Sequence, residues 1–133
     1  MKAPKNKEER MNSKEISEKI AEVLLDKKAS DVEIIPVSKK TIIADYFVIA
    51  TGTSTTHIKA LADEVSFVLK KECNIISERV EGMSTARWVL IDYRDVIVHI
   101  FHPEERSNYS LEKLWETRPA DPSILEESTG DAT

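Results

Sequence analysis

The chain has 133 residues, of which 41% are hydrophobic and 32% charged, and this is the size and balance of one globular domain with a single core. It holds no run near the roughly 18 consecutive apolar residues of a membrane span, and its first ten residues lack the apolar segment of a secretion signal, so we expect a cytoplasmic protein without membrane contact. The formal net charge of −5 argues against a domain that binds nucleic acid mainly through phosphates, because such domains are basic.

The domain is expected to open with an amphipathic helix. Asn12 or Ser13 can cap this helix, and apolar residues then recur at helical spacing from Ile16 to Leu24. Residues 1–12, which precede the helix, show no sustained apolar period and are expected to form a mobile tail.

Two strands are predicted next. Residues 32–37 are rich in β-branched side chains, but Pro36 lacks a backbone donor and therefore favours a strand end or an edge strand. Residues 46–50 form a continuous apolar run, which is typical of a strand buried on both faces.

A long helix is predicted after Gly52, with Thr53 or Ser54 as its cap. Its inward stripe has spacings of three and four residues and consists of Ile58, Leu61, Ala62, Val65, Val68 and Leu69. Asn74 tolerates left-handed backbone geometry and is expected to end the helix. Ile75 and Ile76 are then expected to begin a short strand that leads to a turn at Glu81 and Gly82.

The strands Trp88–Asp92 and Asp95–Phe101 are joined so closely that they predict a β-hairpin. With Tyr93 and Arg94 as the loop, Leu90 lies opposite Ile97, and Trp88 lies opposite His99. One face of this hairpin is almost wholly apolar and is expected to lie under a helix; it holds Val89, Ile91, Tyr93, Val96, Val98 and Ile100.

The other hairpin face combines aromatic, apolar and acidic residues, a mixture that recurs at protein interfaces. It holds Trp88, Leu90, Asp92, Asp95, Ile97, His99 and Phe101. An equally weighted alternative is that another helix covers this face too and that His99 is a hydrogen-bonded histidine of the core. A short helix at residues 111–115 and a mobile acidic tail at residues 117–133 complete the chain, so that the domain is expected to span residues 13–116.

Charge is distributed unevenly along the chain. Residues 1–14 sum to +3, residues 15–115 to −4 and residues 116–133 to −4. A mildly acidic domain suits a basic protein partner, although acidity that only keeps the protein soluble explains the same values.

The sequence gives little support for a catalytic site or a metal site. His99 and His102 are three residues apart on or beside a strand, so their side chains are expected on opposite faces. The segment 51–56 stands at a helix start where an anion can bind, but it lacks the P-loop and dinucleotide motifs, and capping explains it better. The only cysteine, Cys73, has no partner for a disulfide and is expected to pack under its helix.

Four groups of residues match, in chain order, the signatures of one known family. They are Asp45–Ser54 with His57; Glu81-Gly82 with Ala86 and Trp88; Asp92 with Asp95–Phe101; and Tyr109 with Leu111–Trp115. On these residues the chain resembles the ribosomal silencing factor family, also called Iojap-like, over about residues 15–115.

The resemblance implies a single compact α/β (α+β) domain with a mixed β-sheet flanked by helices, similar to a nucleotidyltransferase fold without its catalytic motifs. The sequence agrees with that loss, because the helix start reads Gly52-Thr53-Ser54 instead of Gly-Ser. The acids Asp92 and Asp95 are also three residues apart, whereas the metal-binding pair of such enzymes is Asp-x-Asp. The resemblance therefore implies no catalysis, no cofactor and no metal.

By resemblance, the chain binds the large ribosomal subunit through the ribosomal protein L-fourteen and blocks joining of the small subunit. Little direct nucleic-acid binding is expected, and a homodimer is implied. The alternatives are a factor for large-subunit assembly and an enzyme with residual nucleotidyltransferase activity. The candidate partner-binding residues are Glu81, Gly82, Trp88, Leu90, Asp92, Asp95, Ile97, His99, Tyr109 and Trp115.

One position departs from the family pattern. Most members carry glycine where this chain has Arg94, at a turn position that favours positive φ. Either the turn type differs or Arg94 is strained, and a register shift of two residues would keep the same faces.

Overall fold

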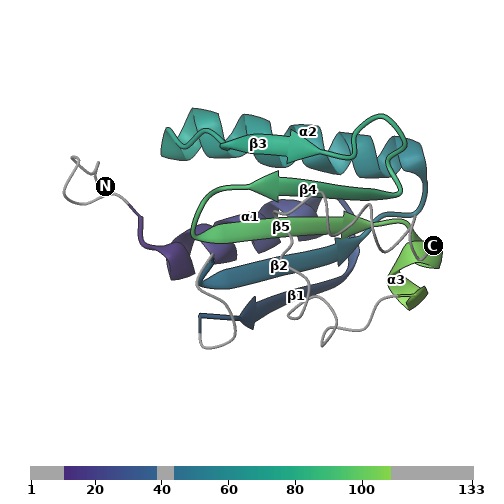
Figure 1. The fold of residues 1–133 in the computed structure, drawn as a ribbon. Coiled ribbons are helices and arrows are strands. Elements are labelled where there is room, and N and C mark those ends of the chain that lie inside the picture. Colours follow the sequence, from purple (N-terminus) through teal and green to yellow (C-terminus); the bar gives the residue numbers. More distant parts are fainter. Residues whose placement is uncertain (1–10, 39–43, 109–133) are drawn as a thin grey trace.

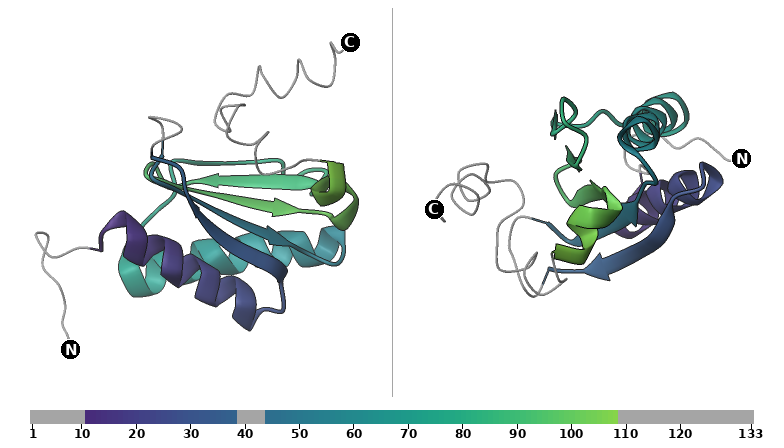
Figure 2. Two further views of the ribbon diagram at one scale, coloured as in Figure 1. Left: turned by 90° about the horizontal axis from the view of Figure 1, so that it is seen from below. Right: turned by 90° about the vertical axis from the view of Figure 1, so that its right-hand side faces the viewer.

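The computed structural model of the protein describes residues 11–38 and 44–108. In this part of the chain, five strands form one mixed sheet in the order β1-β2-β5-β4-β3, with two long helices against one face (Figures 1 and 2). β2 and β5 run parallel, and the other neighbours pair antiparallel. The strands are β1 Ser30–Pro36, β2 Tyr46–Thr51, β3 Arg79–Glu81, β4 Trp88–Asp92 and β5 Val96–Phe101. The predicted α+β class is confirmed.

Both long helices start as the sequence predicts, and α2 also ends where expected. Helix α1 (Ser13–Asp26) has Asn12 as N-cap, and a reciprocal bond with Glu15 completes a capping box. Helix α2 (Thr55–Cys73) is capped by Ser54, whose hydroxyl accepts the His57 N–H, and it ends at Asn74 in the left-handed region. No helix in residues 11–38 and 44–108 combines the length and apolar character needed to cross a bilayer.

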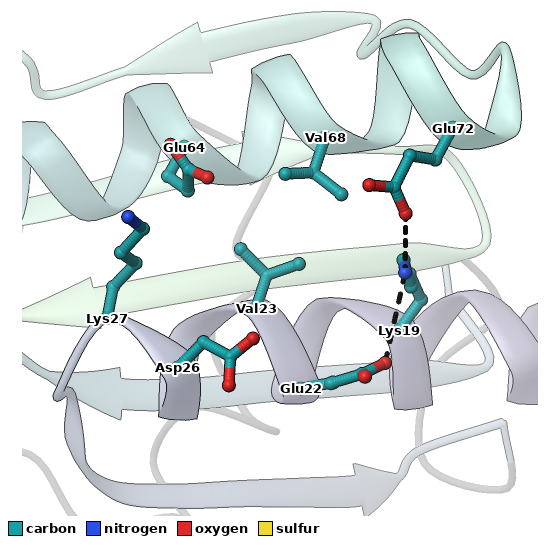
Figure 3. A pocket seen from close by; sticks show the side chains of 8 residues that line it. All are labelled: Lys19, Glu22, Val23, Asp26, Lys27, Glu64, Val68 and Glu72. Atoms are coloured by element: carbon teal, nitrogen blue, oxygen red, sulfur yellow. Dashed lines mark ion pairs between the residues drawn. The ribbon is translucent and has the colours of Figure 1, made fainter.

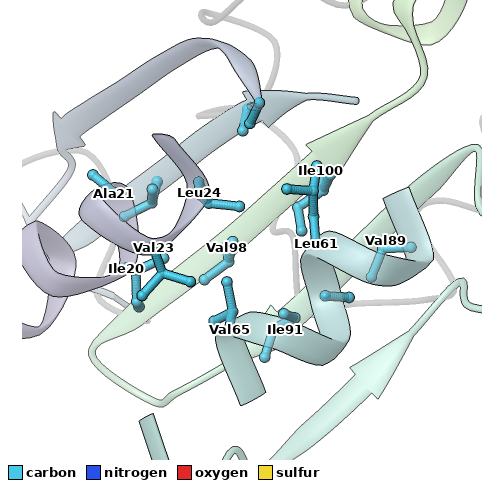
Figure 4. Packing of buried hydrophobic residues seen from close by; sticks show 14 of the residues in the cluster. Ile20, Ala21, Val23, Leu24, Leu61, Val65, Val89, Ile91, Val98 and Ile100 are labelled. Atoms are coloured by element: carbon cyan, nitrogen blue, oxygen red, sulfur yellow. The ribbon is translucent and has the colours of Figure 1, made fainter. Parts of the chain in front are cut away.

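The main core lies between the helices and the sheet (Figure 4). Ile20 and Leu24 of α1 and Leu61 and Val65 of α2 are at most 1% exposed, and they meet the side chains of β4 and β5 that point toward the helices. These strand residues are the apolar hairpin face predicted from the sequence: Val89, Ile91, Tyr93, Val96, Val98 and Ile100. Burial of this face against α1 and α2 fixes which side of the hairpin points away from them.

A second cluster of side chains lies on the opposite side of the sheet, away from α1 and α2. We call this side the second sheet face and define it by Phe47, Ile49, Trp88, Leu90, Ile97, His99 and Phe101. β2 and β5 contribute buried residues to both sides, as the continuous apolar run at residues 46–50 predicts.

The predicted hairpin register is wrong by two residues. In the structure Trp88 pairs with Phe101 and Leu90 pairs with His99. The two loop residues are Arg94 and Asp95, because the Tyr93 N–H donates to the Val96 carbonyl at 2.9 Å. A shift of two leaves every side chain on its predicted face, since side chains alternate with period two.

The predicted strand start at Ile75 and Ile76 is also wrong. The Ile75 N–H still donates to the Leu69 carbonyl at the end of α2, and Ile76 is 68% exposed. Pairing with β4 begins at the Glu78 N–H, which donates to the Asp92 carbonyl at 2.7 Å, so β3 is only three residues long. The helix cap therefore takes up the residues in which we expected the strand to begin.

Arg94 is strained, which is one of the two outcomes that the sequence left open for its turn. Its φ is 77°, and the Asp95 N–H donates to the Tyr93 carbonyl at 3.0 Å, which closes a γ-turn of the strained, positive-φ kind around Arg94. We expect Arg94→Gly to raise the free energy of unfolding by about 1 kcal/mol, because glycine adopts this φ without steric conflict. Urea denaturation measures the change. Arg94→Ala, which also removes the guanidinium but keeps a Cβ, should give no such gain; equal stabilisation by alanine would contradict the explanation.

Candidate functional site

The predicted partner-binding residues of the hairpin do share one side of the sheet. The β4–β5 pairing aligns Trp88, Leu90 and Asp92 with Phe101, His99 and Ile97. β3 extends the same side, because Glu81 pairs with Leu90. Asp95 lies exposed in the turn beyond these residues. Tyr109 and Trp115, the other two candidates, lie outside the described residues.

The accessibility of these residues divides them into two groups. Leu90, Ile97 and His99 are 2%, 1% and 0% exposed, so a partner that docks on the folded domain does not reach them. They belong to a second core, so His99 is a core residue as the alternative expects, but α1 and α2 lie on the opposite face and do not cover it. Trp88 is only partly buried, and Gly82 is exposed. Among the predicted partner-binding residues near the start of β4, the accessible ones are therefore Trp88, Glu81 and Gly82.

His99 is held among aromatic rings. Its ring centroid lies 4.9 Å from that of Phe47, in an edge-on arrangement, and 5.8 Å from that of Trp88. Its Nδ1 accepts the indole N–H of Trp88 at 3.0 Å, whereas its Nε2 is buried without a hydrogen-bond partner among residues 11–38 and 44–108. Burial lowers the pKa of His99 from 6.5 to about 3, so the ring is neutral.

Charged side chains line the β3 edge of the surface. The Arg79 guanidinium lies 2.8 Å from the Glu81 carboxylate and 3.8 Å from that of Asp92, and Arg94 lies 3.7 Å from Glu78. Asp92 also accepts the Arg94 backbone N–H at 2.7 Å, and its side chain is 13% exposed. Asp92 is therefore a largely engaged carboxylate, whereas Asp95 in the turn is exposed.

Gly82 lies directly against the backbone of Trp88. Its φ is 90°, and a Cβ built on it would stand 2.2 Å from the Trp88 carbonyl oxygen. The Gly82 carbonyl accepts the Ala86 N–H at 2.8 Å and closes the turn between β3 and β4. Only glycine satisfies both the conformation and the close approach, which explains the Glu81-Gly82 pattern in physical terms.

The sequence interpretation missed a short helix, α3 (Pro103–Asn108), at the end of β5. Proline at its first position followed by Glu104 and Glu105 is a recognisable helix start. Arg87 binds Glu104 at 2.8 Å and Glu105 at 3.3 Å. The Glu104 hydrogen bond raises the pKa of Arg87, and the same bond lowers the pKa of Glu104. These contacts attach α3 to the residue that precedes Trp88.

Arg106 attaches α3 to strands β1 and β2. Its guanidinium donates to the Thr51 hydroxyl at 3.0 Å and lies 3.4 Å from the Glu33 carboxylate. The helix therefore links the middle of β1, the end of β2 and the residue before β4.

The groove between α1 and α2 is lined mainly by charged side chains (Figure 3). Lys19 bridges the two helices through an ion pair with Glu72 at 2.8 Å. The hydrogen bond between them raises the pKa of Lys19 and lowers that of Glu72. Among the described residues, no three His, Cys, Asp or Glu side chains stand close enough together to hold a metal ion.

His57 has a structural role that the sequence did not predict. Its Nδ1 accepts the Thr53 N–H at 2.9 Å, and its Nε2 donates to the Lys27 carbonyl at 2.9 Å, so it joins the start of α2 to the end of α1. We expect His57→Ala to lower the free energy of unfolding by about 1–2 kcal/mol through loss of both bonds. Urea denaturation checks this, with Lys59→Ala, an exposed change on the same helix, as the matched control. Equal stability of the two variants would contradict the assignment.

Gly52 also has a packing role. A Cβ at this position would stand 2.6 Å from Cγ1 of Ile58, and the Gly52 N–H donates to the Phe101 carbonyl at 2.9 Å. Close contact between the end of β2 and the start of α2 therefore accounts for the glycine, in line with the capping interpretation of residues 51–56.

Comparison with known proteins gives a consistent result. The family model described as "Ribosomal silencing factor during starvation" matches residues 10–133. "Ribosomal silencing factor RsfS" of Bacillus subtilis is 41% identical over 109 residues, which cover 82% of this chain and 92% of the relative. "Mitochondrial assembly of ribosomal large subunit protein 1" of Mus musculus is 32% identical over 112 residues, which cover 80% of this chain and 48% of the relative.

Solved structures show the same fold. A crystal structure of a Chromobacterium violaceum protein superimposes with a TM-score of 0.74 at 36% identity, covering 84% of this chain and 92% of the other. One from Bacillus halodurans superimposes with a TM-score of 0.69 at 39% identity, covering 77% and 94% of the two chains.

Proposed function

Since the chain belongs to the ribosomal silencing factor family, we propose that it binds the large ribosomal subunit and prevents the small subunit from joining it. Translation is thereby repressed when nutrients are short. The observation that carries this proposal is the family match over residues 10–133, supported by relatives whose names refer to ribosomal silencing. A repressor of this kind needs a complementary surface and sufficient affinity, and it needs no catalytic group.

The proposed docking surface centres on Trp88 and the β3 edge. Its charged residues are four acids and two bases, a net of −2, which suits a basic partner such as the ribosomal protein L-fourteen: Glu78, Glu81, Asp92 and Asp95 with Arg79 and Arg94. A half-buried tryptophan such as Trp88 is typical of an interface anchor. Tyr109 and Trp115 are retained as further candidate contacts.

Sedimentation with separated ribosomal subunits tests the proposal. We expect the purified chain to comigrate with the large subunit and then to reduce the yield of joined ribosomes when small subunits are added. Comigration without an effect on joining would overturn the anti-joining mechanism, and absence of comigration would overturn the whole proposal. Weaker comigration at higher salt would support the charge complementarity.

Assembly of the large subunit is a second candidate function. The name of the mouse relative, which is 32% identical, refers to assembly of the mitochondrial large subunit. Accumulation of large-subunit precursors in a deletion strain, with subunit joining unaffected, would favour assembly over silencing. The same surface serves either function.

A homodimer that buries the Trp88 surface is also part of the proposal. It would keep the free protein from exposing this surface and would dissociate on the subunit. Analytical ultracentrifugation at several concentrations measures it, and a species of monomer mass throughout would exclude it.

Trp88→Ala is expected to weaken binding to the large subunit by about 2 kcal/mol, which is roughly 30-fold. The reason is the loss of a large aromatic contact at the centre of the proposed surface. Phe67→Ala is the matched control, because Phe67 is an aromatic residue 58% exposed on α2, in the helical layer behind the sheet. The dissociation constant of each variant is measured with labelled large subunits, and equal affinities of the two folded variants would remove Trp88 from the surface.

A further inference from the structure

The indole of Trp88 is held from two directions. Its N–H donates to Nδ1 of His99 at 3.0 Å, and its ring centroid lies 4.9 Å from that of Phe101 at an interplanar angle of 35°. The hydrogen bond fixes the edge of the indole that carries nitrogen, and the ring contact restricts the tilt of its plane. Trp88 is partly exposed, so its orientation is presented at the surface.

His99 cannot itself be part of that surface in the folded domain. It is 0% exposed and lies in the interior of β5, where it pairs with Leu90 of β4 on one side and with Ile49 of β2 on the other. Phe47 and Phe101 stand beside its ring. Any effect of His99 on a partner must therefore pass through a neighbour that the partner can reach, and Trp88 is such a neighbour.

The position of the proton on the His99 ring shows which nitrogen is available to Trp88. Because Nδ1 accepts the indole N–H, the proton of the neutral ring is on Nε2. Nε2 is buried and has no hydrogen-bond partner in the described part of the chain, which costs folding free energy. Phenylalanine would fill similar space without this cost, so packing alone does not account for a histidine here. The accepting Nδ1 is the polar contact that distinguishes histidine from phenylalanine at this position.

We propose that His99 is a positioning residue, whose Nδ1 holds the Trp88 indole in the orientation that the ribosomal partner contacts. The inference rests on the function proposed above. A side chain that is fixed before docking loses less conformational freedom on binding than a mobile one. Removing the acceptor without changing the volume should therefore weaken binding, although residue 99 touches no partner.

A double-mutant cycle tests this role. His99→Phe keeps a ring and removes the acceptor, whereas Trp88→Phe keeps a ring and removes the donor. We expect His99→Phe to weaken binding to large subunits by about twofold to tenfold, the range that corresponds to releasing one ordered side chain. In the Trp88→Phe background the same change should have no further effect, because the hydrogen bond is already absent. An equal loss in both backgrounds would mean a general structural effect and would overturn the proposal.

A fluorescence measurement reports on the indole without the ribosome. The chain has two tryptophans, so a Trp115→Phe background leaves Trp88 as the only emitter. In that background His99→Phe should lower the time-resolved anisotropy of Trp88, and His99→Asn, which places an amide oxygen near the position of Nδ1, should restore part of it. Unchanged anisotropy in folded His99→Phe would overturn the positioning role.

The two proposals fail in different ways. Wild-type protein that does not bind large subunits would overturn the proposed function, and the role of His99 in partner binding would fall with it. Wild-type protein that binds, together with His99→Phe that binds equally well, would overturn only the role of His99. Circular dichroism and urea denaturation of each variant confirm that the domain remains folded.

Discussion

Gly82→Ala is expected to lower the free energy of unfolding by about 3 kcal/mol, a larger effect than that of substitution at His57 or Arg94. A φ of 90° costs a residue with a Cβ about 1–3 kcal/mol. The new methyl group would also stand 2.2 Å from the Trp88 carbonyl oxygen, a backbone atom of β4 that can move only with its strand. Overpacking of this kind typically costs a further 1–3 kcal/mol, or about as much again. Urea denaturation at neutral pH measures the sum.

Ser84→Ala is the matched control for Gly82→Ala, since Ser84 is exposed in the same turn and its substitution should change stability by less than about 0.5 kcal/mol. The glycine variant should also bind large subunits more weakly than the control, because relief of the clash displaces Trp88. Wild-type stability and affinity in Gly82→Ala would mean that the turn does not approach β4 as described.

The elements predicted best from the sequence are those with strong local signals. Asn12 and Ser54 at the helix starts and Asn74 at a helix end each make a local bond or conformation that the residue type favours. The assignment of hairpin residues to two faces also held, because alternation with period two survives an error in register. The grouping of Trp88 with Asp92 therefore followed from residue patterns alone, whereas the fold class was implied by the family resemblance.

What the sequence did not predict depends on contacts between distant segments. The hairpin register depends on where the loop begins, and the sequence did not show that Tyr93 is paired through its N–H with the Val96 carbonyl instead of lying in the loop. The packing role of His57 comes from a carbonyl thirty positions earlier in the chain. The near-complete burial of Leu90, Ile97 and His99 depends on what covers a sheet face, whereas alternation reports only which side chains share it.

The candidate site was consequently predicted as a group of residues but not as an accessible surface. Sequence reasoning placed His99 among the contact residues because it shares a face with Trp88. The structure places it buried beside Trp88, where its chemistry can be tested without any partner.

The free energy of unfolding at acidic pH tests whether His99 is neutral in the folded protein. Its expected change is second only to that caused by Gly82→Ala. Burial lowers the pKa of His99 to about 3 in the folded state, whereas an unfolded chain has a histidine pKa near 6.5. Below pH 6.5 His99 therefore binds a proton in the unfolded state but stays neutral in the folded state. The free energy of unfolding consequently decreases as the pH falls from 6.5 toward 3. Each pH unit within that window corresponds to about 1.4 kcal/mol, so the loss relative to pH 7.5 should approach roughly 3 kcal/mol at pH 4.5.

Comparison with His99→Phe isolates this contribution from those of other groups. The two proteins differ only at residue 99, so the difference between their stability curves reports on that position. We expect the difference in unfolding free energy, measured by urea denaturation from pH 7.5 to 4.5, to change in favour of His99→Phe as the pH falls. Parallel curves would show that His99 takes up its proton in the folded state as readily as in the unfolded one. A ring protonated at both nitrogens can no longer accept the indole N–H, so parallel curves would also mean that the hydrogen bond from Trp88 to His99 is lost below pH 6.5.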